Sequence, residues 1–242
     1  KTKSVKASLT TMCLFIVVVC VAVIGAVSVF NIRSMSNMAN SNYENAMSDG
    51  YNSEIKSEVQ SVISILQSEY DRVQAGDLTE EAAKKEAAEI VRAMRYRDDG
   101  SGYFWIDDTD YNLIMHPILP DQEGNNRYDL TDQNGVKIIQ EIMKVCTGAD
   151  GGGYNEFYFT KSDGVTVAPK VAYSELFAPW GWVVSTGNYV DDMDATMAAA
   201  KTAIQQKEST MIISIVGIGL LMAVIAALVS IKFGNVICKP LV

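Results

Sequence analysis

The stretch "FAPWGWVVSTGNYVDD", residues 177–192, holds two tryptophans around a glycine, then an apolar run, then two aspartates. Its "WVVSTG" portion (182–187) is typical of a β-strand that follows a turn. No helix breaker lies between Tyr189 and Ser209, so a helix is predicted to continue directly from the strand. We expect core roles for the tryptophans and tight turns at the glycines, namely Trp180, Trp182, Gly181 and Gly187. The last strand of a sheet is therefore predicted to be joined directly to a helix.

That helix leads into an uncharged apolar run, Met211–Ile231, and a similar run, Ala7–Phe30, lies near the start of the chain. The runs contain 21 and 24 residues, and about 20 helical residues cross a bilayer core. A signal peptide would have an apolar core of only about 7–15 residues, and a buried core helix is rarely uncharged over such a length. We therefore predict transmembrane helices at 7–31 and 211–231.

Lysines flank both runs on their outer sides, at Lys1, Lys3, Lys6, Lys232 and Lys239. The positive-inside rule predicts that residues 1–6 and 232–242 are cytoplasmic and that residues 32–210 lie outside. Because the chain begins without Met and stops at "FGNVICKPLV", we expect it to be part of a longer protein, cut just inside the membrane.

The predicted exterior region is strongly acidic. It contains all 29 Asp and Glu but only 15 of the 20 Lys and Arg, which gives a formal charge of −14. Nucleic acid is not expected as a partner, because its recognition needs a basic face. Only Cys146 of the four cysteines lies in this region, so no internal disulfide is expected there.

Two helices are predicted at the start of the exterior region. Residues 32–75 contain an apolar stripe at spacings of mostly three and four, which predicts an amphipathic helix that extends the first membrane span as a stalk. The stripe consists of Ile55, Val59, Val62, Leu66 and Val73. Gly76 is expected to end this helix, and either Asp77 or Thr79 to cap a second helix within 77–97.

Residues 102–188 contain short runs typical of β-strands, separated by residues typical of turns. The expected strands are "YFWI" (103–106), "LIMH" (113–116), "YNEFYF" (154–159), "VTVAPKVAY" (165–173) and "WVVSTG" (182–187), with a helical piece at 134–146. Pro169 predicts an edge position or a bulge in its strand. The fold class is therefore predicted to be α+β, with a five-stranded antiparallel sheet, helices on one side of it, and a final helix at 189–210.

Catalytic and metal-binding motifs are missing from the sequence. The single histidine cannot form a zinc cluster, and "DDTDYN" (107–112) lacks the spacing of a calcium-binding loop, so an acidic turn is the simpler interpretation. "GADGGG" (148–153) lacks the Lys-Ser/Thr ending of a phosphate loop, and no G-x-S-x-G motif is present. We expect no catalysis, no metal and no cofactor.

Three basic side chains are candidates for binding an anion. Lys170 lies in the otherwise uncharged "VAPKVAY", where a cation is unfavourable unless it is paired or reaches solvent. His116 ends an apolar run directly before Pro117, and Arg95 ends a predicted helix. A structural histidine and a helix-end arginine are the alternatives for these two.

Four aromatic residues are candidates for the walls of a pocket, where their hydroxyl and indole groups would donate hydrogen bonds to an anion. They are Tyr103, Trp105, Tyr158 and Tyr173. The alternative is that they are ordinary core aromatics.

The ordered segments "RYRDDGSGYFWIDD", "LIMHP", "GGGYNEFYF" and "PKVAYSELFAPWGWVVSTGNYVDDMD" resemble the single-Cache (sCache_2) sensor domain of bacterial transmembrane receptors. The resemblance covers nearly the whole exterior region. It implies a PAS-like sheet held by the long stalk helix, with one pocket for a small carboxylate such as acetate, propionate, pyruvate or lactate.

Carried over to this sequence, the resemblance implies carboxylate contacts from Arg95, His116 and Lys170, with Tyr103, Trp105 and Tyr173 as pocket walls. Relatives often have Tyr at position 157 and Trp at position 159. Here Phe157 and Phe159 lack those donors, so the identity of the ligand stays open.

The layout resembles that of methyl-accepting chemotaxis proteins, with residues 232–242 entering a HAMP linker. This implies a receptor in the bacterial inner membrane, a homodimer, and cytoplasmic chemotaxis kinase and adaptor partners. One alternative is the input region of a histidine kinase or a cyclic-di-nucleotide enzyme. An alternative of another class is a protein-binding or scaffold module without a small ligand.

Overall fold

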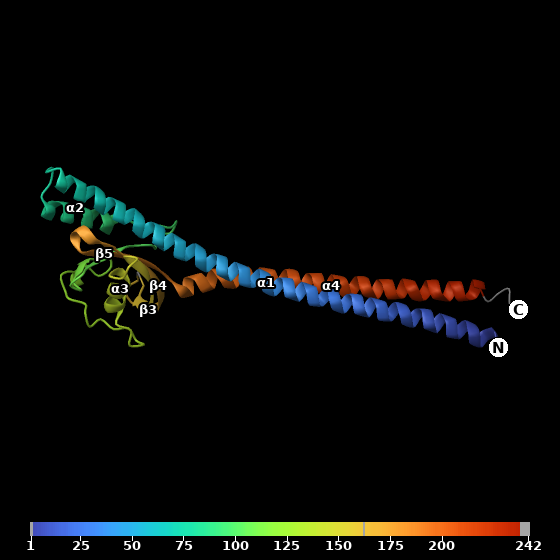
Figure 1. The fold of residues 1–242 in the computed structure, drawn as a ribbon. Helices are drawn as coiled ribbons and strands as arrows, with labels where there is room; N and C mark the ends of the chain where they lie inside the picture. The colour runs from blue at the N-terminus through green and yellow to red at the C-terminus, as the bar shows by residue number, and fades with distance from the viewer. Residues whose placement is uncertain (1, 162, 238–242) are drawn as a thin grey trace. The chain divides into compact units, whose positions relative to one another are not determined.

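The structure is a computed structural model that describes residues 2–161 and 163–237. The elements run α1 (Thr2–Gln74), α2 (Glu80–Ala93), β1 (Trp105–Asp108), β2 (Leu113–Met115), η1 (Pro120–Gln122), α3 (Ile138–Cys146), β3 (Gly152–Thr160), β4 (Val167–Phe177), η2 (Ala178–Trp180), β5 (Trp182–Tyr189) and α4 (Val190–Ile237) (Figure 1). The end of the predicted HAMP linker, 238–242, and Lys1 lie outside the described residues.

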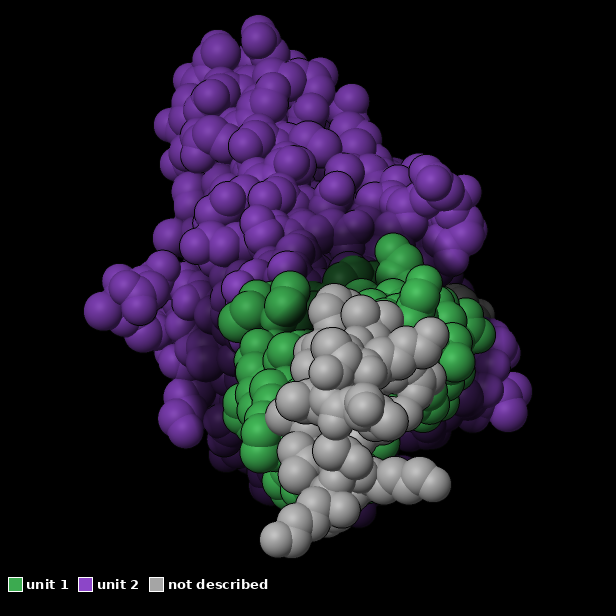
Figure 2. Space-filling view, turned by 90° about the vertical axis from the view of Figure 1, so that its right-hand side faces the viewer, with its two compact units in different colours: residues 1–44, 198–242 green, residues 45–197 purple. Residues whose placement is uncertain are grey.

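The chain divides into two compact units, residues 1–44 with 198–242, and residues 45–197, coloured separately in Figure 2. The described residues of the first unit are all helical. Both α1 and α4 contain a stretch long and apolar enough to cross a membrane, within Thr10–Gln74 and Val190–Lys232. Their large apolar side chains are exposed, as at Phe15 (68%) and Ile213 (71%). A core helix would bury such side chains, so both helices are candidate membrane spans.

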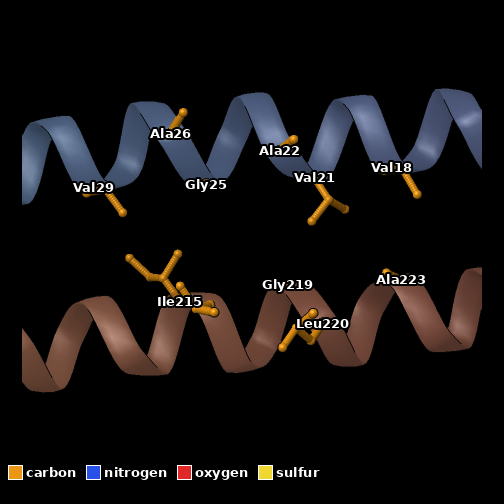
Figure 3. A pocket seen from close by; sticks show the side chains of 11 residues that line it. Val18, Val21, Ala22, Gly25, Ala26, Val29, Ile215, Gly219, Leu220 and Ala223 are labelled. Carbon is orange, nitrogen blue, oxygen red and sulfur yellow. The ribbon is translucent and has the colours of Figure 1, made fainter.

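Within the first unit the two helices approach each other through small residues (Figure 3). Ala22, Gly25 and Ala26 of α1 lie across from Gly219 and Ala223 of α4 and line a groove of about 310 Å³. A methyl group added to Gly219 would lie 3.3 Å from a Val21 side-chain carbon. Small residues therefore permit this close approach of the backbones, as in other membrane helix pairs.

The second unit contains a five-stranded antiparallel sheet in the order β2-β1-β5-β4-β3, which confirms the predicted fold class. β4 lies between β3 and β5, but its pairing with β5 begins only at Lys170. Pro169 therefore has a strand neighbour on one side alone, as the expected edge position requires.

The two faces of the sheet carry different helices. One face packs against the apolar stripes of α1 and α2, which include Ile55, Val59, Val62, Ala87 and Val91. Trp180 and Trp182 are buried in this same cluster, where they have the core role expected of them.

The other face of the sheet packs against α3. The expectation that all helices lie on one side is therefore wrong for this helix. α3 buries its own apolar positions, Ile138, Ile139, Ile142, Met143 and Cys146, against the strands that follow it. The candidate residues Tyr103, Trp105 and Lys170 lie on this second face.

The structure has the predicted end of α1, the predicted cap of α2 and the predicted turn before β5. Gly76 has a left-handed φ of +82° directly after α1, which glycine adopts without strain. The Thr79 hydroxyl accepts a hydrogen bond from the Ala82 N–H at 3.3 Å and caps α2. Gly181 has a φ of +63° after η2 and forms the turn into β5, as predicted.

Candidate functional site

Lys170 is a buried cation in the middle of the sheet, with 1% of its surface exposed. Directly opposed residues on neighbouring strands share a face, so Lys170 lies between Phe157 of β3 and Tyr189 of β5. Its Nζ donates a hydrogen bond to the Tyr103 hydroxyl at 3.0 Å. Among the described residues no carboxylate lies within ion-pair distance of Lys170.

Aromatic rings surround the Lys170 ammonium group. The Nζ lies 4.4 Å from the ring centre of Tyr103, 4.6 Å from that of Trp105, 4.8 Å from that of Tyr189 and 5.8 Å from that of Phe159. Such cation–π contacts contribute roughly 0.5–2 kcal/mol each. They offset part of the free-energy cost of desolvating the cation but supply no negative charge.

His116 lies in the same aromatic cluster and is 1% exposed. Its ring centre is 5.5 Å from that of Tyr103, 6.3 Å from that of Trp105 and 6.0 Å from that of Phe159. Three rings are thus shared with Lys170. This aromatic cluster, comprising Tyr103, Trp105, His116, Phe159, Lys170 and Tyr189, combines residues of four strands and two loops.

The backbone fixes the tautomer of His116. Its Nδ1 accepts hydrogen bonds from the N–H groups of Ile118 and Leu119, both at 3.1 Å. An acceptor nitrogen carries no proton, so the proton of the neutral ring is on Nε2. That Nε2 is buried and has no hydrogen-bond partner among the described residues. A buried donor without a partner is unfavourable by about 1–3 kcal/mol, and a ligand oxygen would satisfy it.

Burial, with the nearby positive charges of Arg127, Lys170 and Arg92, lowers the pKa of His116 to about 3. Between pH 6.5 and 3 the unfolded chain therefore binds a proton that the folded chain does not. The contribution of the neutral His116 to the free energy of unfolding is complete above pH 6.5 and decreases as the pH falls. From pH 7 to 4.5 we expect His116 to lower the free energy of unfolding by about 2–3 kcal/mol. Melting temperatures of the wild type and His116→Gln across this range test this, since the variant should lack that part of the slope. Parallel curves would contradict it.

The cluster brings together three hydrogen-bond donors without a counter-charge. Lys170 supplies a cation, and His116 supplies an unpartnered N–H. The Tyr103 hydroxyl accepts from Lys170 and keeps its own proton to donate. A carboxylate would provide the missing negative charge and two acceptor oxygens, through charge-assisted hydrogen bonds. The arrangement is suited to binding an anion.

Three of the sequence candidates lie elsewhere. Arg95 is exposed, and its guanidinium donates to the carbonyls of Arg92 and Met94 at the end of α2. Tyr173 is an odd number of residues from Lys170 on β4, so its side chain lies on the opposite face, against α1 and α2. Tyr158 directly follows Phe157, which pairs with Lys170, so the Tyr158 side chain also points to the other face of the sheet. The structure therefore does not bring these three side chains together with the aromatic cluster.

Tyr189 is not a candidate from the sequence, because the absence of a helix breaker after it predicts that it begins a helix. It is instead the last residue of β5, directly opposite Lys170. Its hydroxyl donates to the Thr160 carbonyl oxygen at 2.6 Å and lies 3.4 Å from the Tyr103 hydroxyl. Burial raises its pKa. Strand alternation, continued two residues beyond "WVVSTG", is the signal that identifies it.

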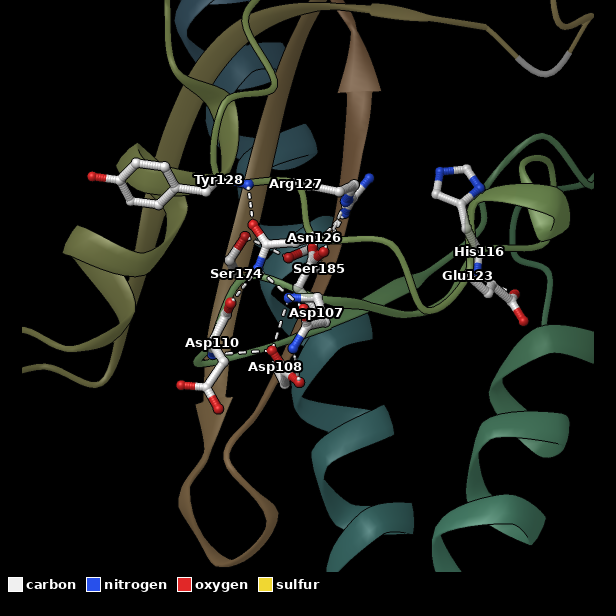
Figure 4. Close-up of polar contacts among 11 residues, drawn as sticks. Asp107, Asp108, Asp110, His116, Glu123, Asn126, Arg127, Tyr128, Ser174 and Ser185 are labelled. Atoms are coloured by element: carbon white, nitrogen blue, oxygen red, sulfur yellow. Dashed lines mark hydrogen bonds and ion pairs between the residues drawn. The ribbon is translucent and has the colours of Figure 1, made fainter.

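A buried ion pair supports one wall of the cluster (Figure 4). Arg127 donates from Nε to Asp107 Oδ1 at 2.9 Å and from Nη2 to both carboxylate oxygens, and neither side chain exposes more than 4% of its surface. Asp107 follows Trp105 by two residues on β1 and shares its face of the sheet. The pair thus attaches the segment after β2 to the strand that carries Trp105.

Gly187 is required for close packing and not, as expected from the sequence, for a turn. A methyl group there would lie 2.5 Å from the Val171 carbonyl oxygen and 2.9 Å from both Ala172 Cα and Lys170 Cε. We expect Gly187→Ala to lower the free energy of unfolding by about 1–3 kcal/mol, because backbone atoms must move. Gly50→Ala, in helix α1, is the control. A methyl group added at Gly50 would have no neighbour within 4 Å, and the variant should raise the free energy of unfolding by up to about 1 kcal/mol. Equal melting temperatures for the two variants would contradict this.

A cavity of about 340 Å³ has Lys170 in its lining and so adjoins the aromatic cluster. It is lined by Asp132, Asn134, Val136, Glu156, Phe157, Tyr158, Pro169, Lys170 and Val190. Two carboxylates in this lining disfavour an anion there, and the lining contains neither His116 nor Tyr103. The anion-binding geometry therefore belongs to the aromatic cluster. Among the described residues, no three acidic, His or Cys side chains are grouped to hold a metal ion.

The chain is similar to known bacterial receptors. The chain is 34% identical over 167 residues to the methyl-accepting chemotaxis protein McpP of Pseudomonas putida, which covers 69% of this chain and 28% of McpP. It is 36% identical over 143 residues to the sensor histidine kinase MctS of Rhizobium johnstonii, covering 59% and 30% of the two chains. The chain thus spans less than a third of the length of these relatives.

A solved Cache chemosensory domain, described as a structural basis for carboxylic acid recognition, superposes with a TM-score of 0.57 at 29% identity. The match covers 60% of this chain and 97% of that domain. Residues 47–203, more than half of the chain, match the family model for the single Cache domain 2, sCache_2. The chain belongs to the single Cache domain 2 family.

Proposed function

We propose that the chain is the sensing and membrane-spanning part of a bacterial chemoreceptor, and that it binds a small carboxylate of the acetate, propionate, pyruvate or lactate type. The observation that carries the proposal is the buried Lys170, which has no carboxylate partner among the described residues and lies beside the unpartnered Nε2–H of His116. The match to a domain described as recognising carboxylic acid supports the same ligand class.

The composition of the cluster favours a ligand with one carboxylate. Lys170 is the only Lys or Arg in the aromatic cluster, so a second carboxylate on the ligand would enter without a counter-charge. Trp105 and Phe159 both present apolar ring surface close to the donors. A short, mostly apolar remainder on the ligand suits such walls.

We place both candidate spans in the bacterial inner membrane, with residues 32–210 on the outer side and residues 232–242 entering a HAMP linker. The lysines that flank the apolar runs support this orientation. We further propose, from the resemblance to methyl-accepting chemotaxis proteins, that the receptor works as a homodimer and signals to a cytoplasmic chemotaxis kinase through an adaptor. The ligand is the one small-molecule partner proposed, and no enzymatic activity is assigned to the chain.

Signal transmission would begin at Tyr189, which contacts the cluster and directly precedes α4. Lys161 donates to the carboxylates of Asp191 and Asp192, both at 2.8 Å, and so ties the hairpin end to the first turn of α4. We hypothesise that ligand binding shifts β5 and α4, moving the second span against the first. Cross-linking rates between cysteines engineered into the two spans, in a chain cleared of native cysteines, should change with ligand; unchanged rates would oppose this.

A histidine kinase is the second candidate for the whole protein, since MctS has a comparable identity to this chain. In that case the same site would regulate a cytoplasmic kinase domain, and the residues that follow Val242 would distinguish the two. A scaffold module without a ligand predicts no stabilisation by small molecules.

A thermal-shift screen of the full chain in detergent tests the proposal. The panel contains acetate, propionate, pyruvate, L-lactate, amino acids, amines and purines. A ligand that binds only the folded state raises the melting temperature. We expect a rise with at least one small monocarboxylate and none with amines. Stabilisation by a different class, or by nothing in the panel, would overturn the proposed ligand class.

A further inference from the structure

Arg92 and Glu123 form an ion pair outside the aromatic cluster. Arg92 lies in the last turn of α2. Its guanidinium donates from Nη1 to Glu123 Oε1 at 2.6 Å and from Nη2 to Oε2 at 2.9 Å. Both side chains are about three-quarters buried, at 27% and 23% exposure. A bidentate pair of this kind fixes the carboxylate in orientation as well as in position.

Glu123 in turn contacts the backbone of His116. Its Oε1 accepts the His116 N–H at 2.8 Å, and Figure 4 shows the two residues side by side. The intervening segment, which includes η1, folds back so that the N–H groups of Ile118 and Leu119 reach the His116 Nδ1. The His116 ring is thus held at Nδ1 and its backbone is held at the N–H, and Nε2 is the one free donor of the ring among the described contacts.

The charges of the pair are matched to this arrangement. Burial opposes the ionised form of Glu123, but the Arg92 guanidinium and the His116 N–H outweigh it and lower the pKa of Glu123. The carboxylate is therefore ionised at neutral pH, when it accepts the His116 N–H most strongly. Glu89 also binds Arg92, at 3.2 Å, yet among the described contacts it has none with His116.

We propose that Glu123, oriented by Arg92, is a positioning residue that holds His116 with its Nε2–H aimed at the ligand carboxylate. The inference rests on the proposed carboxylate site. It extends that site to helix α2, because the donor His116 is attached through Glu123 to Arg92. Removal of the pair would leave Lys170 in place but loosen the 116–123 segment, whose Ile118 and Leu119 N–H groups fix the tautomer and orientation of the His116 ring.

The first test needs no ligand. His116 is the only histidine of the chain, so the imidazole nitrogen resonances of protein labelled with ¹⁵N-histidine, without a histidine tag, need no assignment. We expect wild type and Glu89→Ala to show one tautomer, with the proton on Nε2. Glu123→Ala, and more weakly Glu123→Gln, should show a mixed or exchange-broadened imidazole signal. An unchanged imidazole spectrum in Glu123→Ala would overturn the positioning role.

The second test is a double-mutant cycle on affinity, measured calorimetrically with whichever monocarboxylate gives the thermal shift. Glu123→Ala should weaken binding by about tenfold, the size expected for a lost hydrogen bond to a charged group. Glu89→Ala should change it less than about twofold. In the His116→Ala background the effect of Glu123→Ala should shrink below about twofold, because there is no ring left to position.

The outcomes separate the two proposals. A tenfold effect that persists in the His116→Ala background would mean that Glu123 acts elsewhere, and the positioning role would be wrong. Failure of every monocarboxylate to bind the wild type would overturn the proposed ligand, while the imidazole spectra would still decide the positioning role. Melting temperatures show whether each variant is folded, and Glu123→Gln, which keeps the side-chain volume, replaces Glu123→Ala if that variant unfolds.

Discussion

Lys170→Met is expected to raise the melting temperature of the ligand-free protein and to abolish carboxylate binding. The buried ammonium has one neutral hydrogen-bond acceptor, Tyr103, and aromatic neighbours, but no negative charge. Desolvation of a buried cation costs several kcal/mol, and the neutral acceptor and the rings offset it only in part because they carry no opposite charge. Met keeps the length and apolar character of the stem, so the stability should rise by about 1–3 kcal/mol.

The loss of affinity follows from the same burial. Truncation of one member of a buried, hydrogen-bonded charge pair typically costs about 2–5 kcal/mol, so binding should weaken at least about 30-fold. Titration calorimetry and thermal unfolding of wild type and variant measure the two effects. Lys144→Met is the control, because the Lys144 side chain is 74% exposed. If Lys170→Met binds a monocarboxylate as tightly as the wild type, Lys170 is not the anion partner.

Arg127→Ala should destabilise the protein by about 3–5 kcal/mol, the largest loss of stability expected from a single charge removal. It would leave the carboxylate of Asp107, which is fully buried, without its partner. The segment that follows β2 would also lose its attachment beside Trp105. The melting temperature in detergent measures the loss.

Two further variants define the cause. Lys137→Ala removes an equivalent charge from the Asp129 pair at the surface, where the side chains are 47% and 86% exposed, and should change the stability by less than about 1 kcal/mol. The double variant Asp107→Asn with Arg127→Met removes the unpaired charge and should recover part of the loss. Equal losses of stability in Arg127→Ala and Lys137→Ala would show that the buried pair stabilises the protein no more than the surface pair does.

Two of the three donors in the aromatic cluster stand out in the sequence because of their surroundings. A lysine in an uncharged strand and a histidine at the end of an apolar run are unfavourable to bury, and both are buried in one cluster. Strand periodicity also contained the information against Tyr158 and Tyr173. An odd separation from Lys170 or from its partner Phe157 puts a side chain on the other face.

What the sequence could not supply was long-range register and boundaries. Tyr189 was assigned to a helix that begins one residue later, and this one-residue error removed it from the site. The packing of α3 on the second face could not be read from its own apolar positions, because they fit either face. No sequence feature near His116 indicates that Glu123, seven residues downstream, would bind its N–H. Nor does any indicate that Arg92 of α2 would in turn bind Glu123.

The most direct measurement for the carboxylate site is the Nε2–H resonance of His116 during titration with the monocarboxylate that stabilises the protein. We predict that the proton and nitrogen signals move progressively as the site fills, because the ligand oxygen accepts this hydrogen bond, and that Lys170→Met shows no movement. Saturation of the protein by the ligand with an unmoved Nε2–H signal would show that the carboxylate binds outside the aromatic cluster.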